Sequence, residues 1–571
     1  PLIGVVIIPE GKKTGVETDI DGKFKIRVPD GTKALNISYI GYKPISLKPQ
    51  SALGTIALET NENILQDVVV TQSIARTRMT PVAITNVDAA AIETRIGNQE
   101  FPEVLKTTPG VWVTKDGGGA GDAKVTMRGF KSPNTAYLVN GIPVNDMEWG
   151  GIYWSNWGGL SEVTSSMQTQ RGLGASILSA PSVGGTVNIV TKSLDAKKGG
   201  SVWYAMGNDG FNKIGATVST GLMDNGWALT VLGARTWSDG YIQGTGNNAY
   251  TYFVNISKRI NDDHQLSFTA TGAPQWHYQR SNQNGLTIEG WQEARNYMNG
   301  ESPYRYNPTF GYDKYGNAIN TSYNHYHKPH ISLAHTWQID YKSSLSTSIY
   351  ASIATGGGYA GQGRSVTWNG ISVSRNSWYG ASSGVLNTAF RNADGSFDYA
   401  AIQEMNEQST TGSVLVMSDS ENSHEWYGLV SNYKNAIVPG HLTFTAGLDL
   451  RYYVAHHKNK IVDLYNGEYY IDPSRVPGKT MNPENNYLAA DPEWVNQKLG
   501  VGDIVYRDYD GHITQEGIYL QGEYTGLDKR LTAILTGTVN NSTYWNVNRF
   551  YYDKEHEKSA THNFVAGSVK G

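Results

Sequence analysis

The sequence predicts a mainly β protein whose larger, C-terminal part forms a transmembrane antiparallel β-barrel. From about residue 196 to the end, apolar and small polar residues alternate in stretches of roughly ten residues, as on strands with one apolar face. Short and long connections alternate between these stretches. Charged residues make up only 17%, while Tyr (36), Trp (15) and Gly (64) are numerous. This balance is typical of a large barrel with a wet interior and an aromatic girdle.

Residues 1–60 are predicted to form a small N-terminal β-sandwich. Short β-prone runs are separated by the turn signals PEGKK, DIDG and PDGT. The acidic DIDG segment is interpreted as a turn, because a calcium loop of the EF-hand kind needs about twelve residues and a terminal Glu.

Residues 61–80 are predicted to be a linker that contains one strongly β-prone run, DVVVT, at residues 67–71. An exposed run of this kind can add as a strand to the edge of a partner's sheet, where backbone hydrogen bonds supply the affinity. Alternatively, the run could be the last strand of the N-terminal sandwich.

Residues 81–195 mix helix and strand signals. AAAIETR and EFPEVLKTTPG indicate short helices, while VWVTKDG, AKVTMRGF and AYLVNGIPV indicate strands. The segment DGGGAGDAK is interpreted as a flexible loop, because it lacks the Gly-Lys-Ser/Thr that would reach phosphates and magnesium.

Residues 196–571 are predicted to contain roughly twelve strands, with ISLAHTWQIDY and LTFTAGLDLRYYV as examples of the alternation. Long connections are expected near residues 273–328, 357–422 and 457–512. A soluble β-sandwich or propeller would have a similar strand content. Loops of roughly fifty residues at every second connection are uncommon in such compact domains, so a barrel is favoured.

The composition argues against several other classes of site and partner. The chain has no Cys, which excludes disulfides and thiolate metal ligands. No apolar run approaches the roughly 18 residues of a spanning helix, so strands are expected to cross the membrane. The net charge of −4 argues against nucleic acid as a partner. No nucleophile–base spacing indicates an enzyme, and no cofactor is expected.

Three motifs between residues 125 and 192 carry a family resemblance. VTMRGF, YLVNGIPVND and QRGLGASILSAPSVGGTVNIVTK resemble, in order and spacing, three blocks of the plug domain of TonB-dependent receptors. Leu173 replaces the usual Pro of the third block, and LSAPSVGG stands where Tyr-Gly is common. The motif residues are Arg128, Gly129, Gly141, Arg171, Gly172, Gly184, Gly185 and Asn188.

The first domain also carries a resemblance. GVETDIDGKF at residues 15–24 and YIGYKP at residues 39–44 are similar to the carboxypeptidase-regulatory-like domain. The resemblance covers residues 1–195 by motif, whereas residues 196–571 share only the architecture of the family.

The resemblance implies an α+β plug domain inside a barrel of the 22-stranded type, in which about 22 strands surround a plugged lumen. The protein would lie in the outer membrane of a Gram-negative bacterium, in contact with its lipid. Its N-terminal domain and Ton box would lie in the periplasm. Because only about twelve strands are counted, roughly ten C-terminal strands are expected to be absent from this sequence.

The resemblance identifies DVVVT as the Ton box, which the TonB protein of the inner-membrane motor complex would pull. Its residues are Asp67, Val68, Val69, Val70 and Thr71. Force on this segment would remodel the plug and admit a scarce or bulky nutrient of the glycan, peptide, siderophore, haem or cobalamin class. A surface lipoprotein lid is a further partner that some relatives use. The alternative is a barrel that acts as adhesin, secretion partner or scaffold without energy-coupled uptake.

Two plug arginines are expected to be buried against the barrel. Arg128 and Arg171 match arginines that face carboxylates on the barrel wall in the family, with Glu516 and Glu523 as candidate partners here. Removing one side of such a buried pair is costly. Alternatively, both arginines simply reach water in the lumen.

Aromatic residues are candidates for contact with the imported molecule. In the plug loop EWGGIYWSNWGG, Tyr153, Trp154 and Trp157 could stack on a sugar or peptide, or could instead pack against the barrel wall. Trp276 and His277 lie at the base of a long loop and could have either role.

His325, His327 and His330 are weak metal candidates, because alternating histidines on a strand share one face. Their place, where a long loop returns to a strand, favours an aromatic and polar girdle instead.

Overall fold

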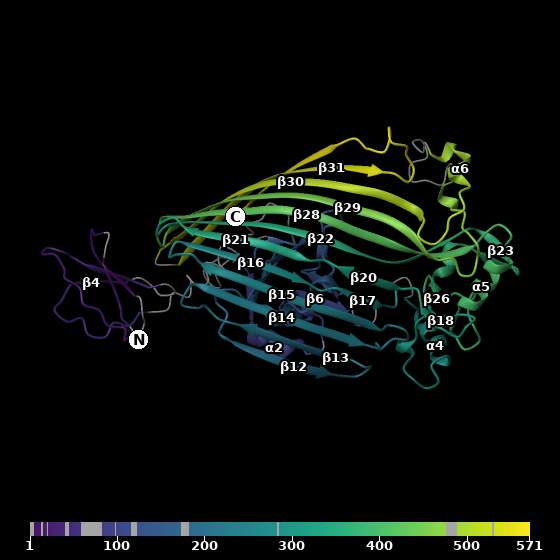
Figure 1. Ribbon diagram of the computed structural model, residues 1–571, viewed down its shortest axis with the longest axis horizontal. Coiled ribbons are helices and arrows are strands. Elements are labelled where there is room, and N and C mark those ends of the chain that lie inside the picture. Colours follow the sequence, from purple (N-terminus) through teal and green to yellow (C-terminus); the bar gives the residue numbers. More distant parts are fainter. Residues whose placement is uncertain are drawn as a thin grey trace.

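The computed structural model contains an N-terminal β domain, a mixed plug domain and a wall of long antiparallel strands (Figure 1). It describes residues 5–12, 15–19, 21–39, 45–58, 83–97, 99–115, 123–172, 182–281, 285–475, 488–527 and 530–571. The strand-rich composition and the plug beside a large barrel-like wall confirm the predicted fold class.

The N-terminal domain has a four-stranded sheet in the order β2-β1-β3-β4. Its strands are β1 (Val6–Pro9), β2 (Val16–Glu17), β3 (Leu35–Ser38) and β4 (Ile45–Leu47). Alternate residues of β1 and β3, such as Ile7 and Ile37, face a small apolar core. The Asp19 carboxylate accepts backbone hydrogen bonds from Asp21 at 3.0 Å and Lys23 at 2.8 Å, which forms the predicted turn.

The plug domain is built on a five-stranded sheet in the order β5-β10-β11-β8-β9. Strands β11 and β8 run parallel, and a separate hairpin joins β6 to β7. The strands are β5 (Ala83–Asp88), β6 (Val111–Lys115), β7 (Ala123–Met127), β8 (Thr135–Val139), β9 (Ile142–Pro143), β10 (Thr164–Arg171) and β11 (Gly185–Thr191). The helices are α2 (Ala89–Ile96), α3 (Leu160–Val163) and the 3₁₀ helices η1 (Phe101–Thr107), η2 (Ser132–Asn134) and η3 (Trp154–Trp157).

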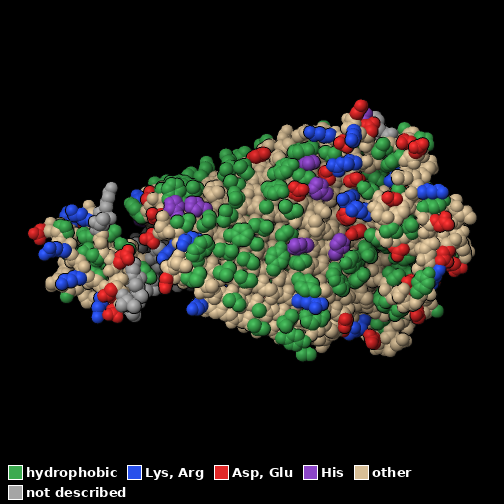
Figure 2. Space-filling model, viewed as in Figure 1, with side chains coloured by type: hydrophobic (Ala, Val, Ile, Leu, Met, Phe, Trp, Pro, Cys, Tyr) green, Lys and Arg blue, Asp and Glu red, His purple; other side chains and the backbone are tan. Residues whose placement is uncertain are grey.

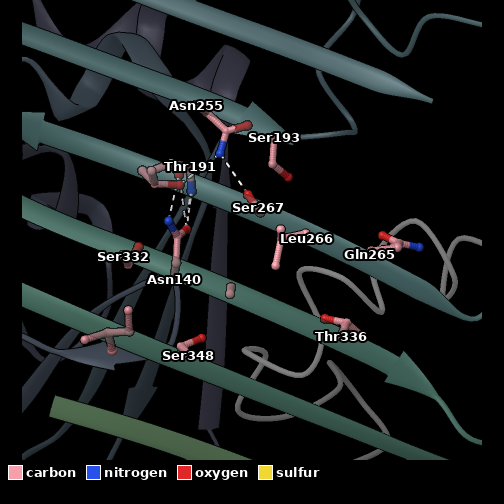
Figure 3. Close-up of a pocket in the computed structure, with 13 residues that line it drawn as sticks. Asn140, Thr191, Ser193, Asn255, Gln265, Leu266, Ser267, Ser332, Thr336 and Ser348 are labelled. Atoms are coloured by element: carbon pink, nitrogen blue, oxygen red, sulfur yellow. Dashed lines mark hydrogen bonds between the residues drawn. The ribbon is translucent and has the colours of Figure 1, made fainter. Parts of the chain in front are cut away.

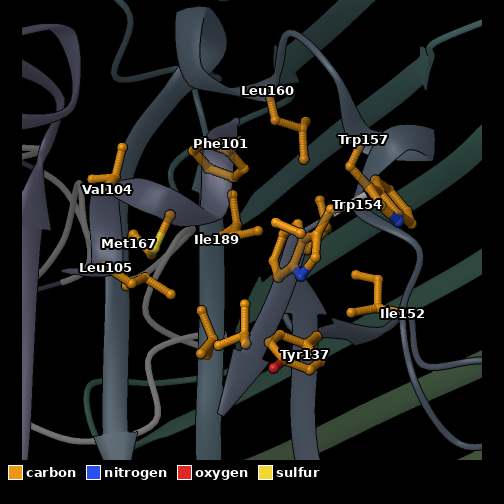
Figure 4. Close-up of a cluster of buried hydrophobic side chains, with 14 of the residues drawn as sticks. Phe101, Val104, Leu105, Tyr137, Ile152, Trp154, Trp157, Leu160, Met167 and Ile189 are labelled. Carbon is orange, nitrogen blue, oxygen red and sulfur yellow. The ribbon is translucent and has the colours of Figure 1, made fainter. Parts of the chain in front are cut away.

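The plug core is aromatic at its centre (Figure 4). The Trp154 ring meets Tyr137 edge to face at 5.2 Å and Phe101 at 6.2 Å between ring centroids. Leu232 and Phe253, which belong to the wall, are part of the same buried cluster. The plug is therefore packed against the wall by apolar contacts as well as by hydrogen bonds.

The wall is one sheet with twelve strands along its main path, as the sequence predicts. In sheet order they are β12 (Gly199–Met206), β13 (Asn212–Ser219), β14 (Trp227–Ser238), β15 (Asn247–Arg259), β16 (His264–Gly272), β21 (His330–Gln338), β22 (Ser343–Gly363), β28 (Leu415–Val438), β29 (Leu442–Asp463), β30 (Ile504–Gly526), β31 (Leu531–Asn548) and β32 (His562–Lys570). Strand β17 (Gln275–Tyr278) follows β16 after an interruption at Pro274, and β20 (Tyr323–His327) precedes β21 with an interruption at Pro329. Neither proline has an N–H for the ladder.

The strands reach further than the sequence predicts. The connection expected at residues 357–422 is shortened, because β22 continues to Gly363 and β28 begins at Leu415. The Gly-rich end of β22 shows no apolar alternation, so its pairing with β28 is not visible in the sequence.

The outer face of the wall is apolar along the middle of the strands. On β30, Ile518 and Leu520 are exposed, while Tyr519 between them is buried on the inner face. Figure 2 shows hydrophobic side chains over the strand region and most charged side chains near the two ends of the molecule. No helix among the described residues is both long and apolar enough to cross a membrane.

The long connections fold into short elements at one end of the wall (Figure 1). Strand β18 pairs with β19 and, in parallel, with β27, which joins the connection after β17 to the connection after β22. The elements are α4 (Ile288–Asn296), η5 (Pro303–Arg305), β18 (Phe310–Tyr312), β19 (Ala318–Asn320), β23 (Val366–Trp368), β24 (Ile371–Val373), η6 (Arg375–Trp378), β25 (Ala381–Ser382), β26 (Val385–Leu386), β27 (Phe397–Asp398), α5 (Tyr399–Gln408), η7 (Pro473–Arg475), η9 (Leu488–Ala490) and α6 (Pro492–Val495).

Candidate functional site

The plug loop between β9 and η3 is fixed by the side chain of Asn145. Its Oδ1 accepts from the Tyr137 N–H at 2.7 Å, and its Nδ2 donates to the carbonyls of Thr135 at 2.9 Å and Gly150 at 2.7 Å. An amide can make these bonds together because it carries both an acceptor and two donors. The loop is therefore tied to the edge of the plug sheet.

The neighbouring Asp146 organises the tip of the loop. Its Oδ1 accepts from the backbone N–H groups of Glu148 at 2.9 Å and Trp149 at 3.1 Å. This arrangement is the turn that Asp favours. It leaves Oδ2 free to reach across to the wall.

A cavity of about 420 Å³ lies between this loop and the wall. A volume of this size is within the range of small-molecule binding sites. The plug lines one side with Asp146, Glu148, Trp149 and Tyr153, among others. The wall lines the other side with residues of β17, β20, β22, β28 and β29, including His277, His325, Tyr326, Lys328, Tyr359, Asn422, His424, Tyr453 and His457.

Two polar contacts bridge the plug and the wall at the cavity. The Tyr453 hydroxyl donates to Asp146 Oδ2 at 2.9 Å. His457 Nε2 lies 2.7 Å from Glu148 Oε2. Both acidic residues of the loop tip are therefore engaged by β29, which holds the loop in place beside the cavity.

The aromatic residues of the plug loop separate into two groups. Tyr153 and Trp149 are 53% and 41% exposed and lie 4.9 Å apart between ring centroids at the cavity. Trp154 and Trp157 are 2% and 3% exposed and belong to the buried cluster of the plug. The prediction that these two tryptophans contact the imported molecule is therefore corrected: the apolar plug core contains them.

Trp276 and His277 alternate on β17 and so face opposite sides. His277 is buried and lines the cavity, with Nδ1 2.7 Å from Gln275 Oε1. Trp276 is more exposed and meets Tyr278 edge to face at 6.0 Å.

The three histidines proposed as weak metal candidates have different partners. His325 Nε2 lies 2.7 Å from Asp419 Oδ2, and His327 Nε2 lies 3.1 Å from the Tyr252 hydroxyl. His330 is buried, with its ring 5.8 Å from that of Trp157. Within the described part of the chain, no group of three or more His, Cys, Asp or Glu residues could hold a metal ion.

The two plug arginines interact with the plug itself. Arg171 Nη1 donates to the Pro109 carbonyl at 3.0 Å, and the Arg128 N–H donates to the Gly110 carbonyl at 2.7 Å. Among the described residues neither arginine forms an ion pair. The expected pairing with Glu516 or Glu523 is corrected, since Glu516 is exposed and accepts from Asn541.

The second and third plug motifs meet in space. Asn188 Oδ1 accepts from the Gly141 N–H at 3.2 Å, which joins β11 to the turn after β8. Gly185 lies beside β10, where an added Cβ would be 2.2 Å from the Gln170 carbonyl oxygen. Gly172 would likewise direct a Cβ into the Arg128 guanidinium. Close backbone approach therefore explains Gly185, whereas Gly172 has a positive φ of 80° and faces the end of a flexible side chain.

A second, much smaller cavity of about 30 Å³ lies between the plug and the wall (Figure 3). Asn140 of the plug bonds to Thr191 there through its side chain, at 2.9 Å from Nδ2 to Oγ1. The facing wall presents small polar groups such as Ser267 and Ser332. The plug thus faces this part of the wall across hydroxyl and amide groups.

Sequence reasoning missed Trp149, Lys328, Tyr453 and His457. Trp149 lies in the quoted aromatic loop, so its exposure could have been considered. Tyr453 and His457 lie on β29 and Lys328 lies between β20 and β21, and only the folded sheet brings these residues to the loop. The Ton box residues Asp67, Val68, Val69, Val70 and Thr71 lie outside the described residues.

Two family models match the N-terminal part of the chain. Residues 76–186 match the TonB-dependent Receptor Plug Domain, and residues 1–70 match the CarboxypepD_reg-like domain. The plug match contains the first two motifs completely and the third motif as far as residue 186.

Curated relatives match parts of the chain. The chain is 28% identical over 199 residues to TonB-dependent receptor P39 of Formosa agariphila, covering 34% of this chain and 18% of the relative. It is 27% identical over 247 residues to the vitamin B12 transporter BtuB of Vibrio vulnificus, covering 40% and 38%. It is also 37% identical over 70 residues to TonB-dependent receptor SusC of Bacteroides thetaiotaomicron, covering 12% and 7%. The matches thus span well under half of each relative's length.

Solved structures share the fold over most of the chain. The ferric citrate transporter FecA superposes with a TM-score of 0.56 at 14% identity, covering 86% of this chain and 60% of FecA. The siderophore receptor PiuA of Acinetobacter baumannii gives 0.54 at 13% identity, covering 87% and 62%. At this identity the likeness concerns the fold alone.

Proposed function

Because the chain carries the plug domain of the TonB-dependent receptors against a wall of their fold, we propose that it imports a scarce or bulky nutrient across the outer membrane. Force on the Ton box would remodel the plug and open a path beside the wall. The protein would act as a receptor and transporter and not as an enzyme.

The single observation that supports import best is the plug loop held across to β29 beside the large cavity. The bonds from Tyr453 to Asp146 and from His457 to Glu148 couple the loop to the wall at the place where a molecule would bind. A molecule in the cavity touches both the plug and the wall. Its binding can therefore change the contacts that hold the plug.

The proposed arrangement in the cell follows from the domain order. Residues 1–60 and the Ton box at residues 67–71 would lie in the periplasm, residues 81–195 would form the plug, and residues 196–571 would cross the membrane. The apolar outer face of the strands supports contact with lipid. TonB would bind the Ton box as an added strand.

The names of the matched relatives suggest several cargo classes. BtuB is a vitamin B12 transporter, and FecA is a ferric citrate transporter. The residues that line the cavity, with exposed Trp149 and Tyr153 beside polar wall side chains, support a cargo that has both a flat or apolar surface and polar groups. A surface lipoprotein lid over the barrel remains a proposed partner.

Deletion of residues 67–71 tests the proposal. In the full-length protein we expect the deletion to abolish both capture by the purified periplasmic domain of TonB and uptake of the nutrient that supports growth, because the strand that TonB would bind is gone. The amount of receptor in the outer membrane should stay unchanged.

Deletion of residues 73–77 is the matched control, because it shortens the linker equally and leaves the Ton box in place. Unchanged capture and uptake after deletion of residues 67–71 would instead support an adhesin, secretion partner or scaffold.

A further inference from the structure

Lys328 is a buried cation on the wall side of the large cavity. It lies between β20 and β21, directly before Pro329, and is only 7% exposed. Its Nζ is 5.2 Å from the centroid of the Trp426 ring, a cation–π contact that holds the ammonium group in place. Among the described residues that line the cavity it is the one lysine, and no arginine accompanies it.

The other charged groups around the cavity already have polar partners. Glu148 is engaged by His457, His325 by Asp419, and Asp146 by Tyr453 together with two backbone N–H groups. Within the described residues, Lys328 forms no ion pair of this kind. Asp146 lies near enough only to attract it electrostatically. A buried charge without a hydrogen-bonded counterion is costly.

We infer that Lys328 receives an anionic group, a carboxylate or a phosphate, of the molecule that the cavity binds. The inference rests on the proposed function and narrows its cargo to molecules with such a group. A bound anion would supply the counterion that the protein does not, in a site where low dielectric strengthens the bond. Trp149 and Tyr153 at the loop would contact the remainder of the molecule.

The same geometry connects binding to the plug. Asp146, which belongs to the plug loop, is the carboxylate that attracts Lys328 electrostatically. An anion on Lys328 would repel Asp146 and weaken the bond from Tyr453. Occupancy of the cavity would thereby loosen one of the two contacts that tie the loop tip to β29.

Equilibrium dialysis of the purified full chain in detergent, with radiolabelled succinate and phosphate at constant ionic strength, tests the inference. We expect at least one of these anions to bind, and Lys328→Gln to weaken it by about tenfold or more, because a charge-assisted bond is lost. Lys328→Arg should keep most of the affinity. Unlabelled succinamide, which has no charge, should not compete.

Lys460→Gln is the matched control. Lys460 also lies on the wall but pairs with Glu421 at 3.0 Å and does not line the cavity, so its substitution should leave binding unchanged. Absence of binding to both anions, or equal binding by wild type and Lys328→Gln, would overturn the inference. The assay contains no TonB, so its failure is separate from a failure of energy-coupled import.

Asp146→Asn tests the competition between the plug loop and the anion. Asn keeps the Oδ1 acceptor of the turn but removes the charge, so the anion should bind about fivefold tighter or more. Unchanged or weaker binding by this variant would contradict the coupling between Lys328 and the plug loop.

Discussion

At the scale of single residues, burial assigns different roles to aromatic side chains that are adjacent in the sequence. Tyr153 and Trp154 are neighbours, yet Tyr153 is exposed at the cavity and Trp154 is enclosed by Phe101 and Tyr137. The 3₁₀ helix η3 starts at Trp154 and turns its ring into the plug core. Stability and binding should therefore depend on different members of the loop.

Replacement of Trp154 and Tyr153 by Ala should separate these roles. Trp154→Ala is expected to lower the free energy of unfolding of the plug by about 3–5 kcal/mol, because it leaves a large cavity in the core. Tyr153→Ala should change it by about 0.5 kcal/mol or less. Native-state hydrogen exchange of the plug strands measures both effects. Equal destabilisation by the two variants would contradict the assignment.

Gly185 and Gly129 offer a second comparison of single residues. Both have positive φ, at 141° and 85°, but a Cβ on Gly129 meets nothing within 4 Å, whereas one on Gly185 meets the Gln170 carbonyl oxygen at 2.2 Å. Gly185→Ala should therefore lower the free energy of unfolding of the plug by about 1–3 kcal/mol more than Gly129→Ala does, because the backbone of β10 must move. Urea unfolding, monitored through hydrogen exchange of the plug strands, measures the free energy of unfolding of both variants. A larger cost at Gly129 would show that space beside β10 does not matter.

At the scale of elements, Arg391 joins the folded connections at one end of the wall. Its guanidinium donates to the carbonyls of Asn387 at 3.0 Å, Gly395 at 2.8 Å, Gly380 at 2.7 Å and Pro308 at 3.1 Å. Pro308 lies in the connection after β17, and the other three lie in the connection after β22. Together with the β18–β27 pairing, this makes the two connections one unit.

Arg391→Met should loosen that unit. The carbonyls of Asn387 and Pro308 would lose the donor that Arg391 supplies, at a cost of about 1–3 kcal/mol for each group left unsatisfied. The carbonyls of Gly380 and Gly395 would keep a second donor, the Asn387 N–H and the Tyr306 hydroxyl. Limited proteolysis should therefore cleave residues 364–414 faster than in wild type, while the far-ultraviolet strand signal stays the same. Arg295→Met, at an exposed position on α4, should leave the cleavage rate unchanged. Equal cleavage rates for the two variants would show that Arg391 is not required to hold the two connections together.

At the scale of the whole molecule, the plug is held to the wall by dispersed polar contacts and by two apolar clusters. One cluster includes Leu232 and Phe253 of the wall, and in the other Ile142 of the plug packs with wall residues such as Trp426. Lys213 of β13 pairs with Glu162 of α3, and Thr251 of β15 donates to the Gly158 carbonyl at 3.2 Å. Asp146 and Glu148 contact β29 on the opposite part of the wall. Contacts of this kind can be broken separately, which is consistent with the proposed displacement of the plug by force.

The sequence by itself determined the classes of structure along the chain. Period-2 alternation identified the strands of the wall, because this pattern is local and follows from backbone geometry, whereas resemblance to a known family identified the plug motifs. The sequence did not determine where β22 ends and where β28 begins, since the Gly-rich end of β22 pairs with β28 without an apolar alternation.

Only the tertiary structure decided which residues surround the cavity. Asp146 and Tyr453 are 307 positions apart, and no local pattern connects them. Burial likewise separated Trp154 from Tyr153 and gave Lys328 its surroundings. The physical reason is that exposure and charge pairing depend on neighbours that the fold supplies, whereas the period-2 pattern that marks a strand is carried by residues adjacent in the chain.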